Sequence, residues 1–284
     1  MQKLSINELK YKSNDIRKDI IEMLLEAKSG HSAGPLGMAD VFACLYFNVL
    51  NHDPKNPTAE DRDRLVLSCG HINPVLYAAL GEAGYFPKAE LKTLRKFGTR
   101  LHGHPHNLAL PGIETSSGPL AQGSSQACGM AFGLMMDHKK SQRIYLIMSD
   151  GEQQEGQTWE AVMFAGKYRL HNITAIMDRN NIQIDGYTEE VMPLENLRAK
   201  YEAFNWHVLE VDGHNHQEII NACQEAKAIY EKPTLIIAHT VPGKGVDFME
   251  YDFHWHGMPP NKEQAALALK ELRTLRGQIA SEHE

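Results

Sequence analysis

Residues 144–186 read IYLIMSDGEQQEGQTWEAVMFAGKYRLHNITAIMDRNNIQIDG and contain a strand, a helix and a second strand in order. The apolar run Ile144–Met148 ends in Ser-Asp-Gly-Glu, which predicts a buried strand followed by an acidic turn. A helical segment over Gly156–Tyr168 and a second apolar strand over Ile173–Met177 follow. Because such a crossover makes the two strands parallel, we expect both to end at the same edge of a sheet, where open α/β sheets bind ligands.

Oxygen-bearing side chains follow both of these strands. Asp150 comes directly after the first strand, and Asn180 follows the second, 30 positions later (180 − 150 = 30). One carboxylate oxygen and one amide oxygen suit Mg²⁺ or Ca²⁺ when phosphate oxygens and water complete the coordination. Asp-Gly and Asn-Asn are also common turn dipeptides, so a purely structural turn is the alternative interpretation.

The composition is that of a globular protein with a substantial core. The chain has 284 residues, of which 42% are hydrophobic and 23% charged. A net charge of −7 and the lack of a dense Lys/Arg block make nucleic acid an unexpected partner. The four cysteines show no CxxC spacing, so we expect them to be reduced residues of the core. No run of about eighteen apolar residues occurs, so we expect no membrane span. We expect a cytoplasmic protein.

Strands and helices continue to alternate through the rest of the chain. Further strands are predicted at Leu65–Ser68, Val208–Val211 and Thr234–Ala238. Further helices are predicted from Ser5 as cap, and over Ala39–Leu50, Ile72–Ala83, Lys88–Lys96, Gln122–Met136, Leu194–Ala203 and His216–Tyr230. This pattern predicts an α/β fold with a mainly parallel sheet and helices on both faces. We expect a single domain over 1–284, with an amino-terminal helical extension and a carboxyl-terminal helix over 262–281.

Histidines are unusually frequent, with fifteen in the chain, and several lie in predicted loops. His31 lies in a Gly/Pro-interrupted loop between two helices, where catalytic side chains are common, although a structural histidine is equally compatible with the pattern. His102, His104 and His106 form an HxHxH pattern that could bind zinc. Because Gly103 and Pro105 interrupt it, we favour a loop that hydrogen-bonds a hydroxyl-rich or phosphorylated ligand.

Two glycine-rich segments are candidates for binding anions. Residues 116–123, SSGPLAQG, lead into the helix predicted from Gln122, and the exposed N–H groups of such a helix entry favour anions. The small residues of that helix are explained equally well by close helix packing. Pro242–Val246 contains Lys244 but lacks the full phosphate-loop pattern, so it is a weak signal by itself.

Taken in order, these motifs resemble the amino-terminal half of transketolase over roughly Arg17 to Pro260. The matching motifs are Ser29-Gly30-His31 with Leu36-Gly37-Met38-Ala39, Gly70-His71, Gly103-His104-Pro105, Ser117-Gly118-Pro119-Leu120, Asp150-Gly151-Glu152 with Glu155-Gly156, Asn180 with Ile184-Asp185-Gly186, and His256-Gly257. The resemblance implies the diphosphate-binding domain of a thiamine-diphosphate enzyme. It also implies transfer of a two-carbon ketol unit from a ketose to an aldose, with the cofactor supplying the carbanion chemistry.

The resemblance also implies roles for individual residues. Asp150, Asn180 and the carbonyl of Ile182 would bind the metal. The cofactor-binding residues would be His71, Gly118, Leu120, Asp150, Gly151, Glu152, Asn180, Ile182, Lys244 and His256. The catalytic residues would be His31 and His256, which deprotonate the C3 hydroxyl, His104, which binds an oxygen of the transferred fragment, and Glu155, which faces a partner chain.

Full transketolases are considerably longer, because a second domain binds the pyrimidine ring of the cofactor. The resemblance therefore implies the amino-terminal subunit of a split transketolase, which forms an α2β2 assembly with a separate carboxyl-terminal subunit. The sequence departs from the family pattern in four places, namely the pair Ser32-Ala33 and the single residues His106, Ala121 and Ser149. Ser32 and His106 lie in loops that we expect to face the substrate. The sequence therefore leaves two substrate classes open, a pentose phosphate and a modified or sulfonated sugar.

Three other functions are compatible with parts of the pattern. The α subunit of a thiamine-dependent 2-oxoacid dehydrogenase shares the Asp-Gly to Asn signature but lacks the succession of histidine motifs. A non-catalytic thiamine-binding module would bind the cofactor without turnover. A histidine-rich metallohydrolase would use zinc and no thiamine.

Overall fold

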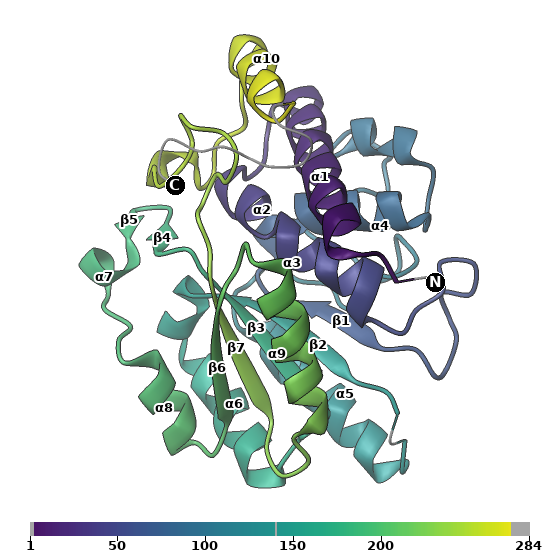
Figure 1. Cartoon of the computed structure of the whole chain (residues 1–284), viewed down its shortest axis with the longest axis vertical. Coiled ribbons are helices and arrows are strands. Elements are labelled where there is room, and N and C mark those ends of the chain that lie inside the picture. Colours follow the sequence, from purple (N-terminus) through teal and green to yellow (C-terminus); the bar gives the residue numbers. More distant parts are fainter. Residues whose placement is uncertain (1–2, 140, 274–284) are drawn as a thin grey trace.

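A five-stranded parallel sheet forms the centre of the computed structural model, which describes residues 3–139 and 141–273 (Figure 1). The strand order is β1-β2-β3-β7-β6, and every neighbouring pair is parallel. The strands are β1 (Arg64–Leu67), β2 (Ile144–Ser149), β3 (Ile173–Arg179), β6 (His207–Asp212) and β7 (Thr234–His239). This confirms the predicted α/β fold and the parallel crossover between residues 144 and 179.

Successive residues of each strand point to opposite faces of the sheet, and each face carries its own apolar core. Tyr145 and Ile147 of β2 belong to one cluster, while Leu146 and Met148 belong to the other. The first cluster includes α1 (Ile6–Ala27), α3 (Ala39–Cys44), α4 (Asn73–Ala83) and α9 (His216–Ala228). The second includes α5 (Gln122–Met136), α6 (Gly156–Tyr168) and α8 (Leu197–Ala203). Helices therefore cover both faces, as the sequence predicts.

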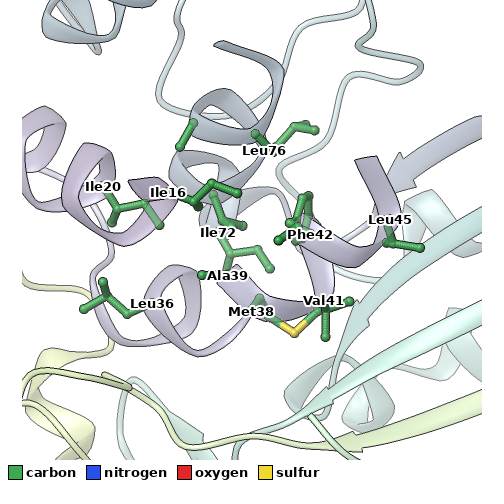
Figure 2. Close-up of a cluster of buried hydrophobic side chains, with 14 of the residues drawn as sticks. Ile16, Ile20, Leu36, Met38, Ala39, Val41, Phe42, Leu45, Ile72 and Leu76 are labelled. Carbon is green, nitrogen blue, oxygen red and sulfur yellow. The ribbon is translucent and has the colours of Figure 1, made fainter. Parts of the chain in front are cut away.

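The amino-terminal helices pack into one apolar layer in the upper part of Figure 1. Figure 2 shows Ile16 and Ile20 of α1 facing Leu36, Phe42 and neighbouring side chains. All of these side chains are fully buried. At the start of α1, Ser5 and Glu8 form a reciprocal capping box, which confirms the predicted helix start. The loop that carries His31 connects α1 to Ala33 and Leu36, which belong to the same buried cluster as α1.

Some predicted boundaries are wrong. The sequence predicts an irregular loop around Gly34 and Pro35, but Ala33–Gly37 forms a short helix, α2. Pro35 is tolerated there because the first turn of a helix needs no N–H from it. The predicted helix Ala39–Leu50 ends at Cys44 and continues as a π-helical turn, η1 (Leu45–Val49).

Other differences occur at element ends. The helix predicted over Lys88–Lys96 is only a 3₁₀ segment, η3 (Lys88–Thr93). The helix α8 begins at Leu197 rather than Leu194, because the Asn196 side chain caps it by accepting from the N–H of Ala199. The remaining elements are η2 (Gly70–Ile72), η4 (Gly151–Gln154), the hairpin β4 (Ile182–Gln183) and β5 (Gly186–Tyr187), α7 (Thr188–Val191), η5 (Phe253–Trp255) and α10 (Lys262–Glu271).

The predicted helix over 262–281 is present as α10 up to Glu271, and its last part lies outside the described residues. Among the described residues, no helix is long and apolar enough to cross a bilayer.

Candidate functional site

Asp150 and Asn180 meet at one edge of the sheet, where β2 and β3 end. Ser149 and Asp178 are register partners, so both chains leave the sheet at the same level. The Asp150 Oδ2 atom accepts from the backbone N–H of Asn181 at 2.8 Å, and the Asn180 Oδ1 atom accepts from the N–H of Ile182 at 3.0 Å. Both side chains are buried, Asp150 with 1% exposure. The structure therefore brings the three predicted metal-binding residues together.

A residue that the sequence analysis missed, Arg179, also contacts this carboxylate. Its Nη1 atom lies 3.1 Å from Asp150 Oδ2, and its Nη2 atom pairs with Glu189 and Glu195 at 2.7 and 3.0 Å. Burial raises the pKa of Asp150 to about 6, and the Arg179 cation opposes that rise. Asp150 is therefore mostly ionised at neutral pH. The sequence did offer a signal for Arg179, because it lies between Asp178 and Asn180 at the end of the second predicted strand.

The donors at this edge fit a hard divalent cation. Asp150 offers a carboxylate, Asn180 an amide oxygen, and no soft sulfur or imidazole ligand is part of the motif. Within residues 3–139 and 141–273, no group of three or more His, Cys, Asp or Glu side chains is arranged to hold a metal ion. An ion bound here would therefore need backbone or amide oxygens and ligands from a bound molecule.

The loop that carries Gly118 and Leu120 is held against the end of β1. Ser117 Oγ donates to the carbonyl of Leu67 at 2.6 Å. A Cβ atom on Gly70 would lie 2.9 Å from the backbone of Ser117, so only glycine permits this close approach. Leu120 packs on the first apolar core, whereas a Cβ on Gly118 would meet only the His104 ring, at 3.9 Å. Gly118 therefore lies open toward the histidine-bearing loop.

Glu152 does not fit the direct cofactor contact that the sequence analysis predicts. Its side chain is fully buried, and its oxygens accept from Ser68 Oγ at 2.5 Å, the Ala121 N–H at 2.6 Å and the Ser149 N–H at 2.9 Å. Ala121 has φ +69°, in the region that favours the glycine of the family pattern. Glu152 thus stabilises the turn that carries Gly118 and Leu120, and its oxygens are occupied by these three internal donors.

Three of the predicted histidines form one cluster, made of His31, His71 and His256. Their ring centroids are 5.0 Å apart for His31 and His71, 5.5 Å for His31 and His256, and 5.2 Å for His71 and His256. Among the described residues, the buried Nδ1 atoms of His31 and His256 have no hydrogen-bond partner. We call these three residues the histidine cluster.

All rings of the histidine cluster are neutral at physiological pH. Burial, followed by the neighbouring His256, lowers the pKa of His31 to about 4. Burial lowers the pKa of His256 to about 4 as well, and holds the pKa of His71 well below its usual value. Neutral rings with free nitrogen lone pairs can accept a proton from a hydroxyl group.

The histidine cluster lies beside the Asp150 edge. A Cβ on Gly34, in the helix that follows His31, would lie 3.8 Å from Asp178 Oδ2 and 4.0 Å from Asn180 Nδ2. Burial raises the pKa of Asp178 to about 7, while Thr240 and Asn180 donate hydrogen bonds to it. The predicted metal-binding and proton-transfer residues thus share one end of the sheet.

The remaining predicted residues differ in their surroundings. His104 is exposed, as are His102 and His106, and the rings of the latter two are 5.5 Å apart. Glu155 is exposed at the amino terminus of α6. Lys244 is buried in the loop after β7, whose Gly243 N–H donates to the carbonyl of Ala33 at 2.9 Å. That loop therefore packs against the segment that follows His31.

Comparison with known proteins places the chain in a family. Residues 10–276 match the family model described as transketolase, thiamine diphosphate binding domain. The chain is 46% identical over 265 residues to the 6-deoxy-6-sulfo-D-fructose transketolase subunit of Clostridium sp. (strain MSTE9), covering 93% of this chain and 96% of that protein. It is 40% identical over 269 residues to an apulose-4-phosphate transketolase subunit of Phocaeicola vulgatus, covering 95% of each.

Longer relatives match only in part. The chain is 38% identical over 271 residues to mouse transketolase, covering 94% of this chain and 42% of that protein. The crystal structure of transketolase from Campylobacter jejuni superposes with a TM-score of 0.90 at 35% identity, covering 98% of this chain and 45% of that chain. The chain thus spans less than half the length of the full transketolases it matches. It belongs to the transketolase family and corresponds to its amino-terminal, thiamine diphosphate-binding part.

Proposed function

We propose that the chain is the amino-terminal subunit of a two-chain transketolase, which transfers a two-carbon ketol unit from a ketose to an aldose. The observation that carries this proposal is the convergence of the Asp150 edge and the neutral histidine cluster on one end of the sheet. The similarity to two transketolase subunits over nearly their whole lengths supports the two-chain form.

In this proposal the sheet edge binds thiamine diphosphate through a divalent cation, Mg²⁺ or Ca²⁺. Asp150, Asn180 and the carbonyl of Ile182 would hold the cation, whose charge would stabilise the bound diphosphate. Gly151, Gly118 and His71 would contact the cofactor, and Leu120 would offer it an apolar surface. When bound, the cofactor supplies the carbon nucleophile that breaks and forms C–C bonds.

The histidines of this chain then handle protons and sugar oxygens. His31 and His256 accept the proton of the C3 hydroxyl, because burial keeps both rings neutral. Each ring returns its proton readily, since burial disfavours the charged form of both rings. His104 hydrogen-bonds an oxygen of the transferred fragment. Lys244 lies in the loop that covers this end of the sheet and adds a cation near the diphosphate or substrate.

The partner is a separate carboxyl-terminal subunit that binds the pyrimidine ring of the cofactor. The exposed Glu155 at the start of α6 faces it and extends a carboxylate network to it. We propose two copies of each subunit. A cytoplasmic location belongs to the same proposal, and four free, buried cysteines are compatible with a reducing compartment.

The substrate we propose is a ketose with an anionic group at the end far from its carbonyl. Two relatives are named for a sulfonated fructose and for apulose 4-phosphate, and pentose phosphates are the substrates expected from the family at large. Ser32 and His106, which depart from the family pattern, lie in the loops of His31 and His104. These loops are where we expect discrimination between sugars.

Co-expression with the carboxyl-terminal subunit tests this proposal. The complex, supplied with thiamine diphosphate and Mg²⁺, should transfer a ketol unit from at least one of 6-deoxy-6-sulfofructose, apulose 4-phosphate and xylulose 5-phosphate to an aldose phosphate. The chain alone should show no turnover, and pyruvate should not serve as donor. Robust turnover by the chain alone would contradict the two-chain form, and turnover of pyruvate would favour a 2-oxoacid dehydrogenase.

A further inference from the structure

The loops of His31 and His104 are joined by one side chain, that of Arg95. The Arg95 Nη1 atom donates to Ser29 Oγ at 2.7 Å, two residues before His31. The Nη2 atom donates to the carbonyl of Gly103 at 3.2 Å, one residue before His104. The planar guanidinium group thus bridges two loops that lie more than seventy positions apart in the sequence (104 − 31 = 73).

Gly103 allows the guanidinium group to lie close against the loop of His104. A Cβ on Gly103 would be 3.0 Å from Arg95 Nε and 3.2 Å from its Cζ. On the loop of His31, a Cβ on Gly30 would make ordinary contact with the guanidinium group, 3.9 Å from Arg95 Cζ, whereas its close contact would be with Leu24 Cδ2, at 2.5 Å. Arg95 is itself fixed by its backbone, whose N–H donates to the carbonyl of Leu101 at 2.9 Å. The bridge is therefore packed on both sides as well as hydrogen-bonded.

Arg95 differs from its neighbour Arg100 in its electrostatic surroundings. Within the described part of the chain, Arg95 forms no ion pair, whereas Arg100 pairs with Glu90 at 2.9 Å. Although part of the His104 side chain is exposed, its partial burial lowers the pKa of the ring, and the Arg95 charge lowers it further. The pKa of His31 is lowered by burial, then by His256, Arg95 and His104. The Arg95 cation between the two loops thus disfavours protonation of both the His31 and the His104 ring, in addition to the effect of burial.

We propose that Arg95 is a positioning residue that holds the loops of His31 and His104 in a fixed arrangement for ketol transfer. It touches neither reacting atoms nor cofactor in this account, and its effect passes through the two histidines. The proposal rests on the function proposed above, because only proton transfer by His31 and oxygen binding by His104 give the arrangement a catalytic consequence. Lysine cannot replace Arg95, since a single ammonium group lacks the fork that reaches both acceptors.

The test compares Arg95→Met, Arg95→Lys and Ser29→Ala with the matched control Arg100→Met. The first readout is the titration of the histidine ring resonances by NMR in the full chain, which requires no turnover. In Arg95→Met the titrations of His31 and His104 should both move to higher pH, by about half a unit or more. In Arg95→Lys, which keeps the charge, and in Arg100→Met they should stay close to wild type.

The second readout is the pH profile of ketol transfer by the complex with the carboxyl-terminal subunit. Both Arg95 variants should lower kcat by about 10-fold to 100-fold, as small misplacements of catalytic groups do, and Arg100→Met should not. The acid limb of the pH profile, where kcat falls as the pH is lowered, should shift only in Arg95→Met. Ser29→Ala, which removes one acceptor alone, should give a smaller loss of kcat and an unshifted limb.

Unchanged titrations and unchanged kcat in Arg95→Met, or changes equal to those of Arg100→Met, would overturn the proposal. If Arg95→Met does not fold, Arg95→Lys and Ser29→Ala decide: wild-type kcat in both overturns it, and a loss in both supports it. A further result separates this proposal from the proposed function. If the wild-type complex shows no ketol transfer but the titrations of His31 and His104 shift as expected, the proposed function is refuted, whereas the placement of the two loops by Arg95 is supported.

Discussion

Two groups of histidines lie inside this protein, and their hydrogen-bond partners differ. The histidine cluster of His31, His71 and His256 has ring neighbours but no carboxylate partner in the described residues. The second group is formed by His214 and His216 around the buried carboxylate of Asp40, at 2.8 and 3.4 Å. In the first group the Nδ1 atoms of His31 and His256 lack a partner among the described residues. In the second group both nitrogens of His214 and the Nε2 atom of His216 connect segments of the fold, although the His216 Nδ1 atom also lacks a partner among those residues.

The second group, which we call the Asp40 network, joins four parts of the chain. Arg17 of α1 donates to Asp40 of α3 through both terminal nitrogens, at 3.2 and 2.5 Å. His214 bonds Asp40 through Nδ1, and its Nε2 atom accepts from the Val241 N–H at 2.8 Å. Although burial favours the neutral acid, Arg17 and His214 hold the pKa of Asp40 well below its usual range. The network therefore anchors the loop after β7 to the amino-terminal helices.

The comparison shows that residue type does not distinguish a reactive histidine from a structural one. An acid partner orients the ring and occupies the nitrogen that faces it, while a ring without such a partner keeps a lone pair for a substrate. We therefore expect substitutions in the histidine cluster to affect turnover, and substitutions in the Asp40 network to affect stability.

The largest effect should come from His256→Gln. Removing a group that accepts the substrate proton should lower kcat/KM of the complex by about 10²-fold to 10⁴-fold. The melting temperature should change little, because the His256 Nδ1 atom makes no hydrogen bond that would be lost. Steady-state kinetics checks this, with His254→Gln, an exposed histidine two positions away, as the control. Equal activities in both variants would remove His256 from proton transfer.

The next largest effect should come from Asp40→Ala, now on stability. The change leaves Arg17 buried without its carboxylate, which typically costs about 3–5 kcal/mol of unfolding free energy. Urea denaturation measures the loss, and Asp15→Ala is the control, since the Asp15–Lys18 pair is solvent-exposed and worth less than about 1 kcal/mol. A similar small loss in both variants would show that the Asp40 network does not stabilise the fold.

A pH-dependent effect should follow from His31. Its pKa is about 4 in the folded chain, against about 6.5 in an unfolded chain, so the unfolded state binds the proton first as pH falls. The wild type therefore loses stability below about pH 6.5 through His31, and His31→Gln lacks this loss. Between about pH 7 and pH 5, the stability difference, wild type minus variant, should fall by about 2 kcal/mol. A difference that is constant with pH, in urea titrations, would contradict the lowered pKa.

The smallest effect should come from Ser32→Ala. Ser32 Oγ donates to the carbonyl of Met258 at 2.5 Å and so ties the loop of His31 to the loop of His256. Losing one such bond should cost about 1 kcal/mol of stability and reduce kcat by less than His256→Gln does. Thermal denaturation and kinetics measured on the same preparation check both quantities. Ser116→Ala, which changes an exposed serine, provides the comparison, and an equal response in the two variants would deny Ser32 this role.

Much of the fold could be predicted from the sequence, because strand and helix patterns are local. The apolar runs at Ile144–Met148 and Ile173–Met177, and the polar residues after them, predict the crossover and its ligand-binding edge. The short helix Ala33–Gly37 and the hairpin at Ile182–Tyr187 were missed, since each is too short to show a hydrophobic period.

The site was less predictable, because its interactions join distant segments. The family resemblance implies that His31, His71, His104 and His256 share a site, but not that Arg95 bridges two of the loops. Likewise, Glu152 follows Asp150-Gly151 in a motif that suggests cofactor contact, yet its partners Ser68 and Ala121 lie 84 and 31 positions away. Ion pairs and buried carboxylates of this kind depend on packing that no local pattern records.

The central claim is that Asp150 and Asn180 hold the cation that binds thiamine diphosphate at the end of the sheet. Calorimetric titration of thiamine diphosphate into the two-subunit complex, with and without Mg²⁺, tests it in wild type and in Asp150→Asn. We expect a loss of metal-dependent affinity of more than about 100-fold in Asp150→Asn, because even outer partners of metal ligands are worth about 10-fold to 100-fold. Unchanged, Mg²⁺-dependent affinity in Asp150→Asn would contradict the account.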